Sequence, residues 1–281
     1  MSSESNGRKP DSQEPGPSSG PGTRASARAP SAWGATRDAL ASVHNLEALL
    51  RSPSVLYRTI RDLLPELRAS AGVLRETFGR ASGGDEALAG AGVYGLGRAE
   101  ELERLLDATA LADEERDDLA DRAGVLADEL EASADLLALL DRASDPVPTE
   151  VQIELVLRGT ARPSGGARGR ELAVRFDAPS PDCTVYADPY VLGSLLSLLI
   201  ARVDATGAPG VIVRASCDEA IAAFEVRAPG PGDATLPEIV ARVLPAIPPA
   251  DAAIRRVALD VGARLDLGER HAELQLPRHI G

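Results

Sequence analysis

The hydrophobic positions of residues 33 to 145 recur every three or four residues, which is the period of a helix with one apolar face. This pattern predicts a first helical arm over about residues 35–79, with breaks at Ser52-Pro53 and at Pro65, where proline begins or kinks a helix. It predicts a second arm over about residues 98–144, with a break near residues 109–113. The two arms together predict an antiparallel helical hairpin.

The second arm carries an apolar seam of the kind that a paired helix needs, with Ser133 as its one polar member. Its other faces are rich in Asp and Glu, but they lack the turn glycine and the ligand spacing of a calcium loop, so a solvated face is expected. A hairpin with such a seam commonly pairs with a second copy, which predicts a homodimeric four-helix bundle over residues 33–145. The seam comprises Leu119, Ala123, Leu126, Leu130, Leu137 and Leu140.

A glycine-rich connection separates the two arms, and its residues 90–95 formally match the dinucleotide fingerprint G-x-G-x-x-G. That fingerprint needs a strand before the glycines and a helix after them. No strand pattern precedes Gly90, so the sequence favours a flexible loop over a phosphate cradle.

The pattern changes after Asp145-Pro146-Val147-Pro148, which predicts a domain boundary near residue 146. Alternating apolar positions beyond it are typical of strands, interspersed with helical stretches. Helices on one face of a mixed sheet, an α+β sandwich, are therefore expected over residues 146–281. The predicted strands are 171–176, 185–186, 211–216, 220–227, 264–267 and 272–276, the predicted helices are 189–203, 236–244 and 250–261, and 150–158 fits either type.

The first residues, 1–32, are rich in Ser, Pro and Gly and show no repeating apolar face. Such a segment cannot bury enough surface to offset its loss of entropy on ordering, so it is expected to be a disordered tail.

Charge and cysteine usage narrow the class of protein. A formal net charge of −13 argues against nucleic acid or an anionic membrane as the main partner. The longest apolar stretch, Val191–Ala201, is too short to cross a bilayer, and the stretch MSSESNGRKP at 1–10 lacks the apolar core expected of a signal sequence. Cys183 and Cys217 lack metal or redox spacing, so we expect a reduced, cytoplasmic protein without a bound metal.

Three segments of the second domain carry a resemblance to a known family. They are RELAVRFDAPSPDCTVYADPYVLGSLLSLLIARV at 170–203, FEVRAPGPGDATLPEI at 224–239, and ADAAIRRVALDVGARLDLGERHAELQLPR at 250–278. In their order and spacing, and behind a helical hairpin, they resemble the core of bacterial sensor histidine kinases. The resemblance implies a dimerisation and phosphoacceptor hairpin followed by an ATPase domain of the type shared with gyrase.

The residues that hold nucleotide in that family are replaced here. The asparagines of the apolar helix align with Ser197 or Leu198 and with Ala201 or Arg202, and none of these offers the carboxamide oxygen that a metal needs. The aspartate of the nucleotide-contacting turn aligns with the stretch 228–232, which has none. The glycine-rich lid aligns with LPAIPPADAA at 244–253, where proline removes N–H donors. We therefore expect no ATP, no metal and no other cofactor.

One residue of the hairpin could still carry chemistry. His44 is the only histidine of the hairpin. An imidazole whose pKa is near neutral can accept a phosphoryl group from an aspartyl phosphate, and Asn45 could orient the ring. In the family, proline usually follows the acceptor by five residues, whereas Pro53 lies nine beyond His44. Aligning that proline places Ala48 at the acceptor position, which leaves His44 as an incidental surface histidine in the alternative interpretation.

Three functions follow as hypotheses. The first is a phosphotransfer protein that exchanges phosphoryl groups between His44 and the receiver domain of a response regulator. The second, ranked nearly equal, is a non-catalytic pseudokinase scaffold that dimerises and binds a partner kinase or another signalling protein. The third, an ATP-dependent kinase, would require replacement ligands that the sequence does not reveal.

Overall fold

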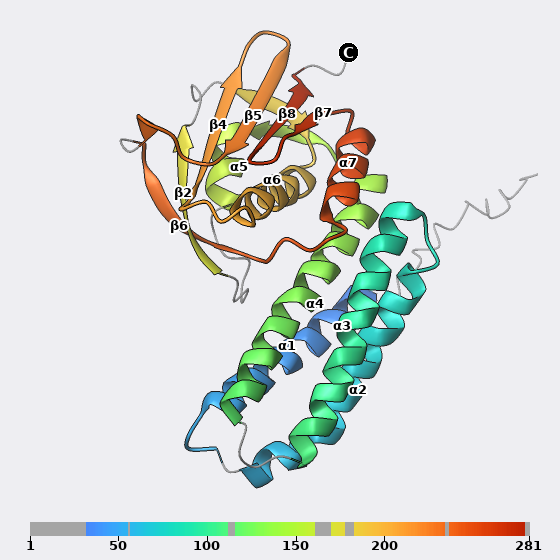
Figure 1. Cartoon of the computed structure of the whole chain (residues 1–281). Helices are drawn as coiled ribbons and strands as arrows, with labels where there is room; N and C mark the ends of the chain where they lie inside the picture. Colours follow the sequence, from blue (N-terminus) through green and yellow to red (C-terminus); the bar gives the residue numbers. More distant parts are fainter. Residues whose placement is uncertain are drawn as a thin grey trace, which may run out of the picture.

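In a computed structural model of the chain, residues 32–55, 57–111, 116–160, 170–177, 183–233 and 236–278 are described. The predicted tail falls outside these ranges. The first domain consists of the helices α1 (Ala32–Arg51), α2 (Tyr57–Ala81), α3 (Glu86–Leu111) and α4 (Arg116–Ser144). Figure 1 shows them side by side, with the second domain at one end of the bundle.

The four helices of the bundle come from one chain. Helix α1 packs against α2 and α4, and α3 packs against the same two neighbours. Each predicted arm therefore consists of two helices packed side by side, α1 with α2 and α3 with α4, instead of continuing as one broken helix. Both breaks are predicted by the sequence, but the predicted bundle took its other two helices from a second chain. Association of two chains stays a prediction, and the bundle does not require it to bury its seam.

The predicted seam forms the centre of the bundle. All six of its apolar residues on α4 are buried, together with apolar residues of the other helices, among them Leu46, Leu74 and Leu105. Ser133 is also buried, and its hydroxyl donates a hydrogen bond of 2.8 Å to the Glu129 carbonyl. A buried hydroxyl with a partner avoids the cost of an unsatisfied donor.

The glycine-rich connection is helical, so the predicted loop is wrong. Gly90, Gly92 and Gly95 lie in α3, and a Cβ atom at Gly92 or Gly95 would overlap the backbone near Ser82 or the ring of Phe78. These glycines let α3 approach α2 closely. The G-x-G-x-x-G spacing is thus a helix-packing feature, which agrees with the absence of a preceding strand in the sequence.

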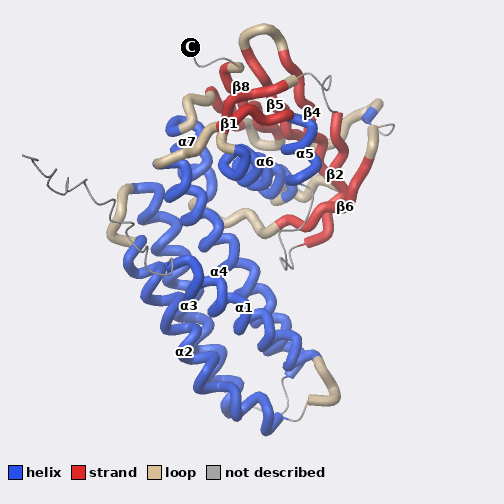
Figure 2. Tube along the Cα trace, turned by 180° about the vertical axis from the view of Figure 1, so that it is seen from behind, coloured by secondary structure: helices blue, strands red, loops and turns tan. Residues whose placement is uncertain are grey.

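The second domain is a sheet covered by helices on one face, seen from the opposite side in Figure 2. The sheet has the order β6-β2-β4-β5-β8-β7, in which β2 and β4 are parallel and the other pairs are antiparallel. A second, two-stranded sheet pairs β1 with β3. The elements are β1 (Thr149–Gln152), α5 (Ile153–Thr160), β2 (Arg170–Asp177), β3 (Thr184–Ala187), α6 (Pro189–Asp204), β4 (Val211–Cys217), β5 (Ile221–Arg227), β6 (Glu238–Val243), α7 (Ala250–Asp260), β7 (Arg264–Leu267) and β8 (His271–Pro277).

The sequence predictions for this domain are confirmed except at one element. The fold class, a helical domain followed by an α+β sandwich with a mixed sheet, is as expected. Residues 236–244, however, were predicted to be helical and contain the edge strand β6, which pairs with β2. The stretch EIVARV is rich in β-branched residues, and pairing with β2 prevails over its weak helical spacing.

The two cysteines also differ from expectation. Cys183 and Cys217 form a disulfide, with their Cα atoms 6.0 Å apart. They are 34 residues apart in sequence, and the bridge joins the segment before β3 to the end of β4. The prediction of two isolated thiols is therefore wrong, because the fold, and not local spacing, brings them together.

Candidate functional site

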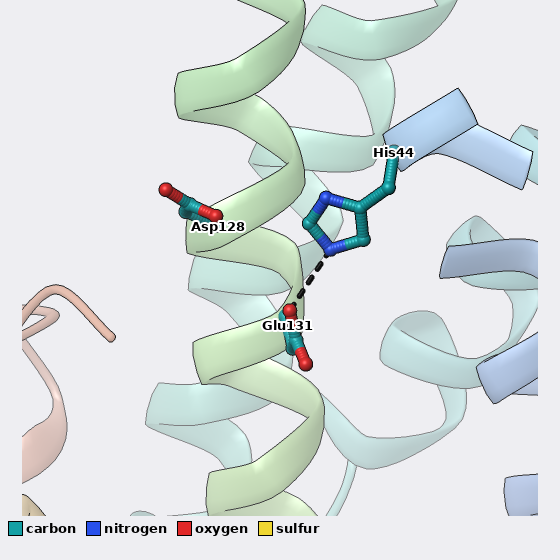
Figure 3. Close-up of side chains that lie close together, drawn as sticks. All are labelled: His44, Asp128 and Glu131. Atoms are coloured by element: carbon teal, nitrogen blue, oxygen red, sulfur yellow. Dashed lines mark hydrogen bonds and ion pairs between the residues drawn. The ribbon is translucent and has the colours of Figure 1, made fainter. Parts of the chain in front are cut away.

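His44, the candidate phosphoacceptor, lies on α1 and turns its ring toward α4 (Figure 3). Its Nε2 atom lies 2.9 Å from Oε2 of Glu131, and 14% of its side chain is exposed. Its Nδ1 atom is buried and has no hydrogen-bond partner within the described part of the chain. One nitrogen is thus engaged and the other enclosed, so in this conformation neither is presented to solvent.

Asn45, the candidate orienting residue, faces another side of α1. Consecutive helical residues point about 100° apart, and Asn45 is exposed at a groove between α1 and α2 that Leu49 and Leu63 also line. The structure therefore does not bring the Asn45 amide to the imidazole. The residue that contacts the ring is Glu131.

Sequence reasoning missed the acids beside His44, since it assigned Asp128 and Glu131 to a solvated face. Both are half-buried, on the side of α4 that meets α1. Their spacing of three residues, which places them on one face of a helix, was a signal in the sequence. Nothing local indicated that this face meets His44, which lies 87 residues from Glu131.

Helix α6 carries the positions at which the resemblance places nucleotide ligands. The helix begins with Asp188 as N-cap and Pro189 at its first position, a start signal that stands in the sequence. Ala201 is buried, and Leu198 is an apolar residue packed against the core. The Arg202 guanidinium donates to Oδ1 of Asp251 at 2.8 Å and to the Gly268 carbonyl at 2.6 Å, so it ties α6 to α7 and the last hairpin.

The segment that corresponds to the nucleotide lid is part of the folded core. The end of β6 and residues 244, 245 and 247 line a cavity together with Leu198 and Ala201 of α6. Ile247 is buried. The segment thus forms one wall of a cavity at the helix face at which a nucleotide would be held.

The glycine-containing turn after β5 is closed by its own ion pair. Two nitrogens of the Arg227 guanidinium donate to the two oxygens of Asp233, at 2.6 and 3.0 Å, and the Gly230 N–H donates to Oδ2 of Asp233 at 2.7 Å. The Arg227 hydrogen bonds, with the Gly230 N–H second, lower the pKa of Asp233 well below its usual range. Asp233 is therefore ionised and engaged inside the turn.

ATP and Mg²⁺, which the resemblance implies, do not fit these residues. Mg²⁺ requires oxygen ligands, and Leu198, Ala201 and Ala228 offer no side-chain oxygen at the aligned positions. The Ser197 hydroxyl donates to the Gly193 carbonyl of its own helix at 3.0 Å and is no carboxamide. The one carboxylate of the turn, Asp233, is committed to Arg227.

Asp188 joins the two domains. Its side chain accepts hydrogen bonds from the N–H groups of Val147, Tyr190 and Val191 and from the Arg142 guanidinium near the end of α4. Burial alone would raise the pKa of Asp188, but these backbone donors and the Arg142 charge outweigh it, so the pKa lies below 3.8. A single carboxylate thus caps α6 and fixes the linker and α4 to it.

A cavity of about 210 Å³ lies between the domains, lined by Arg37 and Asp135 of the bundle and by Tyr190 and Ser194 of α6. The Asp135 side chain is exposed at this cavity, but protein atoms lie on most sides of its carboxyl group. This desolvation, with the charge of Glu131 second and Arg37 opposing, raises the pKa of Asp135 to about 6.

His271, on β8, belongs to no cluster of metal-ligand type among the described residues. His271 lies 3.8 Å from Glu225, on the neighbouring strand β5, and is partly exposed. His279 lies outside the described residues.

Comparison with known proteins gave structural likenesses alone. No family model matches the chain, and no curated protein matches it. Among solved structures, Acinetobacter baumannii histidine kinase AdeS is 13% identical at a TM-score of 0.40, over 65% of this chain and 93% of that chain. A histidine kinase from Burkholderia phymatum STM815 is 16% identical at a TM-score of 0.34, over 75% and 96%.

A third similar structure is histidine kinase ThkA in complex with the response regulator protein TrrA, 13% identical at a TM-score of 0.40, over 79% of this chain and 64% of that chain. These neighbours are of the class that the sequence motifs resemble. All of these TM-scores lie below 0.5.

Across the described residues, no helix has both the length and the apolar character that a membrane crossing needs.

Proposed function

We propose that this protein is a signalling adaptor of the two-component type that works without ATP-dependent kinase activity. The observation that carries the proposal is the lack of metal ligands on α6, where Leu198 and Ala201 line a cavity together with residues 241–245 and offer no side-chain oxygen. A fold that resembles a nucleotide-binding core, without these ligands, retains its surfaces for partners. The partner class that the sequence resemblance implies is a receiver domain or a partner kinase.

Nucleotide binding is the first test. Melting of the purified full chain with increasing Mg-ATP is expected to give no saturable change in Tm, because the aligned positions offer no metal ligand. A fluorescent adenine nucleotide should likewise show no saturable binding. Saturable binding that is lost when Ala201 is replaced by Trp would contradict the proposal.

Phosphotransfer through His44 is the second candidate, and the contact between His44 and Glu131 favours it. In this reaction an imidazole nitrogen attacks the phosphorus of an aspartyl phosphate, a P–N bond forms, and the bond to the receiver aspartate breaks. The aspartate leaves as a carboxylate, and Glu131 accepts the proton from the ring. Glu131 can accept this proton only while Nε2 stays beside it, so the nitrogen that attacks is Nδ1. Nδ1 is buried and the side chain is only 14% exposed, so the bundle must first open beside His44.

Receiver domains phosphorylated with a radioactive label separate the two candidates. A scaffold binds them equally well as wild type and as His44→Ala, and it carries no label after denaturation. A phosphotransfer protein becomes labelled through an acid-labile bond, His44→Ala abolishes the label, and Asn45→Ala serves as the neighbouring control. Absence of both binding and labelling with receiver domains and partner kinases would contradict the proposed function.

A further inference from the structure

His44, Asp128 and Glu131 form a cluster of possible metal ligands that the adaptor function does not use. One ligand atom from each of these side chains lies within 4.8 Å of the other two, and the residues come from the first and the last helix of the bundle. Figure 3 shows the three side chains gathered between α1 and α4. We propose that they bind a divalent transition-metal ion, of the class of Zn²⁺ or Mn²⁺.

The donor set suits this class of ion. An imidazole nitrogen and two carboxylate oxygens are ligands for Zn²⁺ and Mn²⁺, whereas Ca²⁺ prefers six to eight oxygens. Nε2 of His44 and Oε2 of Glu131 are 2.9 Å apart, at hydrogen-bond distance. Ligands about 2.0–2.2 Å from a tetrahedral ion lie about 3.3–3.6 Å apart, so these two side chains need to separate by about 0.5 Å to take an ion between them. Three protein ligands leave a further position for water.

The charges around the cluster support a cation. Neighbouring acids of α4 have cationic or hydroxyl partners: Glu129 accepts from Tyr94 and Arg98, and Asp121 accepts from Arg51. For Glu131, the described side-chain partner is the His44 imidazole. Two half-buried carboxylates beside one imidazole form a donor set that suits a divalent ion.

The proposal goes beyond the adaptor function and does not rest on it. An ion held by α1 and α4 links the first and last helices of the bundle and stabilises the folded chain by mass action. An ion also occupies the imidazole that phosphotransfer would need. Metal binding and phosphoryl acceptance at His44 are therefore expected to exclude each other.

The test uses the full chain, freed of metal by a chelator, and titrated calorimetrically with ZnCl₂, MnCl₂ and CaCl₂. One equivalent of Zn²⁺ or Mn²⁺ is expected to bind, to raise Tm in a saturable manner, and to bind at least tenfold more tightly than Ca²⁺. His44→Ala, Asp128→Asn and Glu131→Gln are each expected to weaken binding at least tenfold. Asp118→Asn, which removes an exposed carboxylate of the same helix, is the matched control and should bind as wild type.

Folding of the variants is controlled separately. Circular dichroism and Tm without metal establish that each variant is folded, and Glu131→Gln keeps the shape of the side chain. Co²⁺ supplies an independent measurement, because its visible absorption should change on binding to wild type and not to His44→Ala. Binding that is unsaturable, tightest for Ca²⁺, or equal in wild type and all three variants would overturn the proposal. Failure of the adaptor function would leave each of these outcomes unchanged.

Discussion

Single carboxylates in this chain behave differently according to what surrounds them. Asp188 and Asp233 each receive several donors, which lower the pKa of both groups. Asp135 lies at the cavity between the domains with Glu131 one turn away, and its pKa is raised. The sequence identified Asp188 through the Asp-Pro helix start. It gave no sign of Asp135 or Asp233, because their environments consist of residues from other elements or from a turn whose shape was unknown.

The raised pKa of Asp135 predicts a pH-dependent penalty. The native state binds this proton up to about pH 6, whereas the unfolded state releases it near 3.8. The contribution of Asp135 to stability therefore falls as the pH rises from about 4 to 6, and it stays low above that range. Asp135→Asn should stabilise the protein at pH 8 by less than about 1 kcal/mol, since solvent contact screens the effect.

Urea unfolding at pH 8 and at pH 4 measures this difference. The gain of Asp135→Asn over wild type should be present at pH 8 and close to zero at pH 4, with Asp118→Asn as the exposed control. A gain of equal size at both values would show that ionisation of Asp135 is not its cause.

At the level of elements, the sequence predicted most helices and strands because their apolar periods are local properties. Helix α6 and the hairpin of β4 and β5 lie where their patterns placed them. The errors have non-local causes. Residues 86–97 are helical because α2 offers a surface that only glycine can approach, and β6 is a strand because β2 has a free edge.

The glycines of α3 give a matched pair of substitutions. Gly92→Ala should lower the free energy of unfolding by about 1–3 kcal/mol, because its Cβ would overlap the backbone near Ser82. Gly97→Ala, on the same helix with nothing within 4 Å of the added atom, should raise it by about 0.5–1 kcal/mol. Urea unfolding of both variants provides the measurement. Stabilisation by both substitutions would show that α3 and α2 are not closely packed.

At the scale of the whole molecule, the arrangement of the helices depends on contacts between segments that are distant in sequence. The sequence resemblance gave the order of the two domains, and the missing asparagines gave the loss of nucleotide ligands. It could not give the intrachain bundle, because a turn at residues 52–55 and a break in a straight helix have the same local signature. The contact of His44 with Glu131 depends on the same chain reversal, so the sequence could not predict it.

The bridge between Cys183 and Cys217 predicts a dependence on reductant. Replacing both cysteines with serine, or adding dithiothreitol to wild type, should lower the free energy of unfolding by about 2–4 kcal/mol, since the cross-link restricts the unfolded chain. Thermal melting with and without reductant measures the loss, and the serine variant should not respond to reductant. Two reactive thiols in the native, unreduced protein would contradict the pairing.

The origin of the bundle in one chain fixes a stoichiometry. Residues 32–144 contain one histidine, so each bundle has a single site at His44 and no symmetry-related copy of it within the same bundle. A partner that docks there, or an ion that binds there, occupies a single site within its bundle. Occupancy should then follow a simple hyperbola with concentration, and the response of each molecule is all or none.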